Sequence, residues 1–318
     1  MPDDAPSPGT TGWEFDRPVP MRGYRWWYVD ALSEDGQHGI TIIAMIGAVF
    51  SPWYAWARRG GGGDPLDHCS LNVALYGRPR RWAMTDRRSR QVTRSESRLA
   101  IGPSSIGWDG SVLTVEIAEI TAPLPSRLRG LVRVRPRALS TRSFALDAQG
   151  KHIWHPIAAR AWAEVEMDSP RLSWAGPCYF DSNWGAAPLE EDFRSWDWCR
   201  AALPEATAIL YNPQRRDGTE RQIALRVADD GSLQDIPPPP PVMLPPTRWW
   251  RIPRPTRSEG PAEVIRTLED TPFYARSVIG TRLLGQPAVA VHESIAFDRF
   301  ASLPVQALLP VRVPRPLR

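Results

Sequence analysis

The sequence predicts an all-β protein built from two successive sets of short strands. The 34 prolines and 23 glycines are spread through all 318 residues, and these helix breakers recur too often for long helices. Short runs in which apolar and polar residues alternate recur instead. Many short strands joined by tight turns are typical of a sandwich or a barrel. The clearest runs lie at residues 71–76, 111–120, 131–135, 161–167, 206–211, 222–227 and 288–295.

Turn signals separate these runs. Asp-Gly pairs occur at residues 109–110, 217–218 and 230–231, and an Asp-Gly pair between two apolar runs is a strong hairpin signal. Near the start of the chain, two strands are predicted on either side of a turn at residues 34–36. The apolar run at residues 39–50 is too short to span a bilayer, which takes about twenty residues, so we predict a buried strand there.

Composition divides the chain into three parts. Residues 1–20 are rich in proline and acidic residues, so we predict a disordered lead-in, with no visible signal peptide. The two strand sets follow at residues 21–155 and 156–310, which predicts two barrels or sandwiches in tandem. An aromatic stretch, residues 151–198, lies at their junction. The proline-rich residues 237–246 must be extended, as a connector or an edge segment.

Charge and cysteine content argue against several classes of protein. The net charge is only +4. One basic run, residues 78–98, is interpreted as a solvated hairpin or loop, with contact to nucleic acid or anionic lipid as the alternative. The cysteines Cys69, Cys178 and Cys199 are widely spaced and odd in number, which argues against a disulfide framework and a structural zinc site. We therefore predict a cytoplasmic protein without a nucleic-acid partner.

The junction stretch carries the residues best suited to chemistry. Tyr179 and Asp181 are two residues apart, so in a strand their side chains share one face. A carboxyl group in an apolar pocket has a raised pKa, because desolvation disfavours its charged form, and it can then act as a general acid. Aromatic faces can stabilise a cation. This pattern predicts protonation of an alkene, with core packing as the alternative. The surrounding rings are Trp154, Trp174, Trp184, Trp196 and Trp198.

A metal site is a weaker interpretation of the same stretch. His152 and His155 could join the carboxylates Asp181, Asp192 and Asp197. A His-x-x-His pair outside a helix directs its two rings apart, however, so we expect no metal. The chain has no P-loop, GxGxxG, GxSxG or HExxH pattern, so nucleotide binding and serine-hydrolase chemistry are not predicted.

Six segments of the chain, in order, match one known family. They are RGYRWWYVDA (22–31), HGITIIAMIGAVFSPWYAWAR (38–58), DHCSLNVALYG (67–77), HIWHPIAARA (152–161), CYFDSNWGAAPLEEDFRSWDWCR (178–200) and HESIAFDRFAS (292–302). On these segments the chain resembles the bacterial carotenoid 1,2-hydratases, also called hydroxyneurosporene synthases. The resemblance implies two lipocalin-like β-barrels packed side by side. It also implies a cofactor-independent hydro-lyase that adds water to the terminal C1=C2 bond of an acyclic carotene, such as neurosporene or lycopene.

The resemblance also implies roles for individual residues. The Asp of the family's Tyr-x-Asp motif, thought to donate the proton, matches Asp181, with Tyr179 beside it. The family's His-x-Trp pair matches His152 and Trp154. We expect Asp181 to protonate C2, Trp154 and Tyr179 to shelter the cation at C1, and His152 to hold the water or take its proton. A substrate pocket is predicted to include four more residues, His68, Asn183, Trp184 and Trp196.

Two further expectations concern access to the substrate and alternative functions. A long hydrocarbon dissolves in membrane, so we expect peripheral association with the inner membrane. Residues 78–98, residues 237–246 and the Trp249-Trp250 pair are candidates for lipid contact. The alternative functions are a non-catalytic carrier of carotenoids or terpenoids, and another cofactor-free hydration or cyclisation in the same fold.

Overall fold

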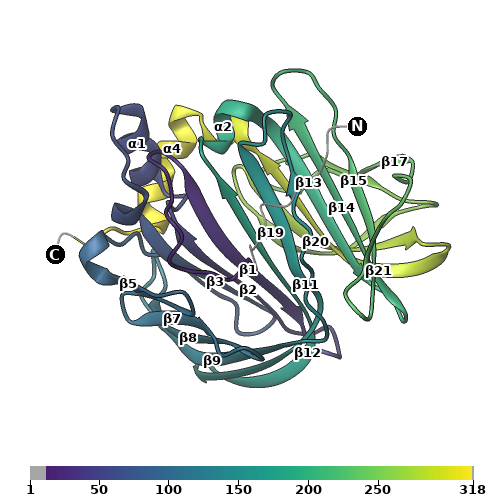
Figure 1. The fold of residues 1–318 in the computed structure, drawn as a ribbon, viewed down its shortest axis with the longest axis horizontal. Helices are drawn as coiled ribbons and strands as arrows, with labels where there is room; N and C mark the ends of the chain where they lie inside the picture. The colour runs from purple at the N-terminus through teal and green to yellow at the C-terminus, as the bar shows by residue number, and fades with distance from the viewer. Residues whose placement is uncertain (1–11, 317–318) are drawn as a thin grey trace. The chain divides into compact units, whose positions relative to one another are not determined.

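A computed structural model describes residues 12–316, and these residues are mostly β-strand (Figure 1). They form two compact units. The first comprises residues up to 145, residues 150–188 and residues from 307 onward, and the second comprises residues 146–149 and 189–306. The predicted β-rich fold is confirmed. No helix among the described residues is long and apolar enough to cross a membrane.

The first unit is built on one curled antiparallel sheet of twelve strands. Their order is β4-β3-β2-β1-β12-β11-β9-β8-β7-β6-β5, and β10 pairs with β11. The strands are β1 (Tyr24–Leu32), β2 (Gly39–Ile46), β3 (Cys69–Tyr76), β4 (Arg81–Ala83), β5 (Val92–Arg94), β6 (Arg98–Ile101), β7 (Ser104–Trp108), β8 (Leu113–Ile120), β9 (Arg127–Pro136), β10 (Phe144–Ala145), β11 (His152–Ser169) and β12 (Arg171–Gly185).

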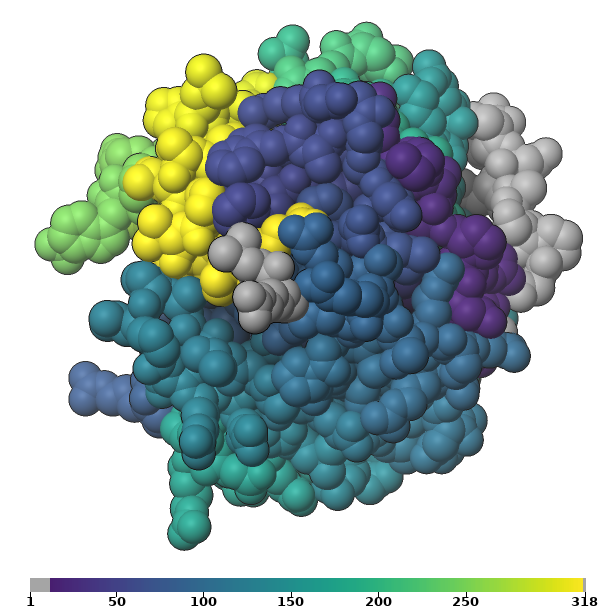
Figure 2. All heavy atoms as spheres, turned by 90° about the vertical axis from the view of Figure 1, so that its left-hand side faces the viewer, coloured from purple at the N-terminus to yellow at the C-terminus, as the bar shows by residue number. Residues whose placement is uncertain are grey.

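Short helices connect some of these strands. α1 (Pro52–Arg59) follows β2, and the 3-10 turns η1 (Pro65–Asp67) and η2 (Ser89–Gln91) flank β3 and β4. α4 (Leu303–Arg312) leads to the C-terminal segment, which returns to the first unit. That segment lies beside α1 (Figure 2), where the Trp53 indole donates a hydrogen bond to the Val313 carbonyl at 2.8 Å.

One face of the first sheet buries the main hydrophobic core. Trp27, Val29 and Ala31 of β1 point to this face, together with buried residues of β2–β4, β6–β9, β11 and β12. The residues that alternate with them along β1 point to the opposite face, and they are buried as well. A strand buried on both faces lacks a polar side, which explains the nearly continuous aromatic and apolar sequence of β1.

The long hairpin of β11 and β12 places the division of the chain elsewhere than composition predicts. The expected boundary at residues 155–156 falls inside β11. Pro156 does not end that strand, because it lies where the register shifts between His155 and Ala158, and a bulge tolerates the missing N–H of proline. β11 pairs with β9 and β12 pairs with β1, so the first unit extends to residue 188.

The predicted lead-in is only partly described. Residues 1–11 lie outside the described residues. For residues 12–20 the prediction of disorder is wrong, because apolar side chains in this segment join the core. Phe15 is fully buried with its ring centroid 4.7 Å from that of Trp27, and the Trp27 indole donates to the Gly12 carbonyl at 2.9 Å.

The second unit contains a seven-stranded antiparallel sheet and a separate two-stranded ribbon. The sheet order is β16-β15-β14-β13-β21-β20-β19, and β17 pairs with β18 in the ribbon. Two short helices, α2 (Leu189–Asp192) and α3 (Phe297–Phe300), flank the sheet in sequence. The strands are β13 (Phe193–Ala202), β14 (Ala206–Arg215), β15 (Ile223–Ala228), β16 (Leu233–Asp235), β17 (Pro241–Leu244), β18 (Arg254–Arg257), β19 (Glu263–Asp270), β20 (Tyr274–Leu283) and β21 (Gln286–Ala296).

Local sequence signals correspond well to these elements. The Asp-Gly turns connect β7 to β8, β14 to β15 and β15 to β16. Their glycines Gly110, Gly218 and Gly231 have φ values of +100°, +77° and +83°, which side chains with a Cβ rarely adopt. Within residues 237–246, Pro241–Leu244 form the strand β17, which pairs with β18. In the ladders of residues 12–316, no pairing joins β4 to β5 or β16 to β19, so neither sheet is closed by hydrogen bonds between its end strands.

Candidate active site

A buried carboxylate with two hydrogen-bond donors lies on the face of the first sheet opposite the hydrophobic core. Asp181 of β12 is 4% exposed. Its Oδ2 accepts a hydrogen bond from the Tyr179 hydroxyl at 2.8 Å and another from the Trp154 indole N–H at 2.9 Å. Both aromatic side chains are fully buried. The two donors therefore hold one carboxylate oxygen in a fixed position.

Strand register brings these three residues together. Tyr179 and Asp181 lie two positions apart on β12 and so share a face, as predicted. Trp154 lies on the neighbouring strand β11, directly opposite Asn183. Directly opposite residues in antiparallel strands point to the same side, so the Trp154 ring meets Asp181 diagonally.

Tyr179 stays protonated in this environment. Burial raises the pKa of the Tyr179 phenol well above its ordinary value, and the charge and hydrogen bonding of Asp181 raise it further. The phenol is therefore neutral and acts as a donor to the carboxylate. Tyr179 therefore keeps its own proton while Asp181 gives up or takes one.

His152 lies on the same face as the carboxylate. It precedes Trp154 by two residues on β11 and is fully buried. Its Nδ1 lies 3.0 Å from the hydroxyl of Tyr24 on β1. The structure thus brings all four predicted catalytic residues, Asp181, Tyr179, Trp154 and His152, to one face of one sheet.

His155 points away from this face. It lies opposite Ser182, which faces the core side, and its Nε2 lies 2.9 Å from the Ser140 carbonyl. Burial lowers the pKa of His155. The rings of His152 and His155 diverge, as expected for this spacing in a strand. No group of three or more His, Cys, Asp or Glu side chains suited to a metal ion occurs within residues 12–316.

The structure places the four predicted pocket residues in different parts of the molecule. Asn183 shares the face of Asp181 and is buried opposite Trp26. Trp184 lies on the other face, because adjacent residues of a strand alternate, and the Arg25 guanidinium lies 5.0 Å from its ring centroid. Trp196 belongs to the second unit, where its ring centroid is 4.7 Å from that of Phe297.

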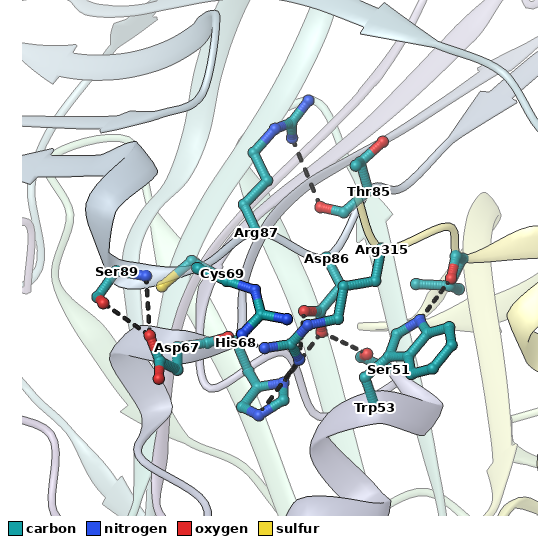
Figure 3. Close-up of polar contacts among 12 residues, drawn as sticks. Ser51, Trp53, Asp67, His68, Cys69, Thr85, Asp86, Arg87, Ser89 and Arg315 are labelled. Carbon is teal, nitrogen blue, oxygen red and sulfur yellow. Dashed lines mark hydrogen bonds and ion pairs between the residues drawn. The ribbon is translucent and has the colours of Figure 1, made fainter. Parts of the chain in front are cut away.

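His68, the fourth pocket residue, belongs to a different polar cluster (Figure 3). Its Nδ1 is 3.3 Å from Oδ2 of the buried Asp86 and 2.6 Å from a guanidinium nitrogen of Arg315. Asp86 also accepts a hydrogen bond from the Ser51 hydroxyl at 2.5 Å and pairs with Arg315 at 3.0 Å. These contacts tie the C-terminal segment to the first unit.

Sequence reasoning missed the contribution of β1 to the site. Tyr24, Trp26 and Tyr28 alternate along this strand and share the face of Asp181. The rings of Tyr24 and Trp26 stack with centroids 4.8 Å apart, and Tyr28 meets Tyr179 edge-on at 6.2 Å. Three aromatic residues at a spacing of two were a signal for one aromatic face, and the sequence contained it.

One family model matches most of the chain. The family model described as "Carotenoid hydratase CrtC" matches residues 42–318.

The chain belongs to the carotenoid hydratase family.

Curated relatives match the chain over most of its length. An acyclic carotenoid 1,2-hydratase of Thiocapsa roseopersicina is 53% identical over 307 residues, which cover 96% of this chain and 76% of that protein. A protein of the same name from Cereibacter sphaeroides is 40% identical over 278 residues, covering 86% of this chain and 98% of the relative. The family resemblance predicted from the motifs is confirmed.

Solved structures share the fold of this chain at low sequence identity. A Nitrosomonas europaea protein described as an AttH has a TM-score of 0.57 and 14% identity, covering 92% of this chain and 99% of that one. Kievitone hydratase from Nectria haematococca has a TM-score of 0.52 and 10% identity, covering 87% and 90%. At such identities the likeness concerns the fold alone.

Proposed function

We propose that the protein is an acyclic carotenoid 1,2-hydratase, a hydro-lyase that adds water across the terminal C1=C2 bond of neurosporene or lycopene. Relatives of that name, 53% and 50% identical over 96% and 95% of the chain, support the assignment. The structural observation that carries the chemistry is the convergence of Tyr179 and Trp154 on one oxygen of Asp181.

Asp181 serves as the acid in this proposal. Because Oδ2 accepts the two hydrogen bonds, the acidic proton is assigned to Oδ1. The O–H bond breaks as the alkene π electrons form a C–H bond at C2, which leaves a tertiary cation at C1. Protonation at C2 is favoured because the alternative cation is secondary. The two donors stabilise the carboxylate as it forms, so they make Asp181 a stronger acid in the transition state.

The aromatic rings and His152 complete the reaction. The faces of Trp154 and Tyr179 shelter the cation, each worth about 0.5–2 kcal/mol in a desolvated site. His152 holds the water that attacks C1 and takes its proton as the C–O bond forms. Return of that proton to Asp181 restores the acid, so the net change is the addition of one water. This chemistry requires no cofactor.

A product assay tests the proposal. Purified protein is incubated with lycopene or neurosporene, and the product is read by mass for the gain of one water. We expect Asp181→Asn to fold normally and to lose at least about a hundredfold in kcat, because general acid catalysis contributes about 10²–10⁴-fold. Asp197→Asn is the matched control. Asp197 is also a buried strand aspartate, but it is bonded to Ser294 in the second unit.

Three outcomes would overturn the assignment. Normal turnover by a folded Asp181→Asn protein would exclude this carboxylate as the acid. Unchanged carotene that co-purifies with the wild-type protein, without hydrated product, would identify a carrier. A product of unchanged mass with altered absorption would indicate a cofactor-free cyclisation instead.

We also propose peripheral association with an anionic membrane surface through the loop between β17 and β18. Trp249 and Trp250 of this loop are 75% and 43% exposed, and the exposed Arg248 and Arg251 flank them. Both tryptophan backbone N–H groups donate to the Asp270 carboxylate, at 2.7 and 3.1 Å, which holds the turn in place. Tryptophan and arginine together suit the interface of an anionic bilayer.

The basic run at residues 78–98 is a weaker candidate for lipid contact. Arg87 is buried and paired with Glu119 at 2.7 Å, and Arg98 pairs with Glu116 at 3.0 Å. Part of its charge is therefore neutralised within the protein. Flotation with liposomes at low and high salt tests the membrane proposal, and failure to float at either salt would reject it.

We infer further that each unit corresponds to one lipocalin-like β-barrel of the carotenoid hydratase fold. The twelve-stranded and seven-stranded antiparallel sheets support this inference. In this assignment β11 and β12 belong to the first barrel. The second barrel begins near residue 189, where the second unit begins.

A further inference from the structure

We propose that Tyr24 is a positioning residue for His152, and that Gly185 provides the space in which their side chains meet. The inference rests on the proposed hydratase function, in which His152 handles the attacking water. It assigns a role to a residue of β1, which lies 128 positions from His152 in the sequence.

The two side chains meet across an intervening strand. Tyr24 on β1 pairs with Gly185 on β12, and Gly185 pairs with His152 on β11. Neighbouring strands are about 4.8 Å apart, so the backbones of Tyr24 and His152 are separated by about twice that spacing. Their side chains nevertheless approach to 3.0 Å between the hydroxyl and Nδ1, with rings nearly parallel at an interplanar angle of 21°.

Glycine at position 185 makes this approach possible. A Cβ placed there would lie 2.6 Å from Cε1 of Tyr24 and 2.7 Å from Nδ1 of His152. Side chains essentially never approach so closely. Gly185 is not among the glycines with positive φ, so its backbone conformation does not call for glycine. The missing side chain, and not backbone freedom, is what the position requires.

The contact acts on the protonation of the two ring nitrogens of His152. The hydrogen bond made by one ring nitrogen sets the protonation of the other. When the Nδ1–H of His152 donates to the Tyr24 oxygen, Nε2 carries the lone pair and can take the proton of the water. The imidazolium that forms keeps this hydrogen bond and strengthens it, because the donor is then charged.

Tyr24 shares this face of the sheet with several other ionisable residues. The neighbouring strands contribute Tyr28 and Asp30 from β1, and Tyr179 and Asp181 from β12. Tyr24 places its hydroxyl 3.0 Å from Nδ1 of the His152 ring. It is only 1% exposed, so water competes little for its hydroxyl.

The test compares Tyr24→Phe with Tyr54→Phe. Tyr54 is a fully buried tyrosine whose hydroxyl donates to the carbonyl of Gly23, one residue before Tyr24. We expect Tyr24→Phe to fold normally, to keep its KM for lycopene and to lose about tenfold in kcat. The acid limb of its pH profile moves down by about one unit, because the imidazolium loses an acceptor. Tyr54→Phe keeps the wild-type pH profile.

A second variant approaches the contact from the middle strand. Gly185→Ala places a methyl group between the two rings, and we expect the same shift of the acid limb. Equal losses in Tyr24→Phe and Tyr54→Phe, or a Tyr24→Phe profile that keeps its acid limb, would show that Tyr24 supports only the start of β1.

A spectroscopic measurement separates this inference from the proposed function. In protein labelled with ¹⁵N at histidine, the His152 ring shifts report its tautomer, and His152→Gln identifies its signals. Tyr24→Phe should mix the tautomers of His152, whereas Tyr54→Phe should not. A wild-type protein that makes no hydrated product would defeat the function alone. Unchanged His152 shifts in Tyr24→Phe would defeat the positioning role alone.

Discussion

Replacing Tyr179 with phenylalanine removes one donor from the proposed acid and leaves the ring in place. The hydroxyl donates to Asp181 Oδ2 at 2.8 Å, and the side chain is fully buried. Burial, with the charge of Asp181, raises the pKa of Tyr179 well above its ordinary value, so the phenol remains a neutral donor throughout the working pH range. The variant therefore tests the hydrogen bond with little change in shape.

The expected magnitude follows from the charge that develops on Asp181. A hydrogen bond to a charged group contributes about 1.5–3 kcal/mol, and the Trp154 indole still donates to the same oxygen. Because about 1.4 kcal/mol corresponds to a tenfold change in rate, we expect kcat to fall by about ten- to a hundredfold when protonation limits turnover. Asp181 also becomes a weaker acid. The alkaline limb of the pH profile then moves up by about one to two units.

The assay measures hydrated product by mass over a range of pH, with kcat and KM determined separately. Tyr54→Phe again serves as the control, since its hydroxyl bonds to a backbone carbonyl and not to Asp181. Thermal unfolding of each variant separates loss of fold from loss of chemistry. In Tyr179→Phe we expect kcat to fall and the alkaline limb to move to higher pH. This combination distinguishes a weakened acid from a general loss of activity.

Two results would refute the reasoning. A slower Tyr179→Phe protein whose alkaline limb stays in place would show that the hydroxyl does not act on the ionisation of the acid. A variant unchanged in both rate and pH profile would show that the bond to Asp181 makes no difference to the transition state.

The remaining predictions concern the C-terminal segment and the exposed loop. Arg315→Ala leaves the carboxylate of Asp86 buried without its guanidinium partner, and we expect the free energy of unfolding to fall by about 3 kcal/mol in denaturant titrations. The control, Arg312→Ala, removes a surface contact over a tryptophan ring and should lower the free energy of unfolding by less than about 1 kcal/mol. Equal losses of unfolding free energy in the two variants would contradict this account. Replacing Trp249 and Trp250 by serine should abolish liposome flotation while leaving thermal unfolding unchanged, and flotation that persists would assign the contact elsewhere.

Much of the candidate site could be predicted because it depends on spacing along a strand. Residues two apart in a strand share a face, and this applies to Tyr179 with Asp181 and to His152 with Trp154. The same alternation separates His152 from His155. It also separates Trp184 from Asp181, so the placement of Trp184 in the pocket did not follow the rule that the rest of the prediction used.

Composition was a weaker guide to boundaries. Phe15 lies in a segment whose prolines and acidic residues predicted disorder, yet its ring packs against Trp27. The predicted boundary at residues 155–156 lies inside β11, which continues past Pro156 through a shift in register. Both errors arise because a residue's local preference is weak compared with the burial and pairing that the surrounding sheet supplies.

The sequence by itself determined the β-rich class, the turns and the pairs of residues that share a strand face, because these depend on contacts between near neighbours. It also carried the motifs that identify the family. Only the tertiary structure decided that Trp154 donates to Asp181, which lies 27 residues away, and that Tyr24 reaches His152 across Gly185. These contacts depend on which strands pair and in what register. That choice is made by the packing of the whole sheet, and no local pattern encodes it.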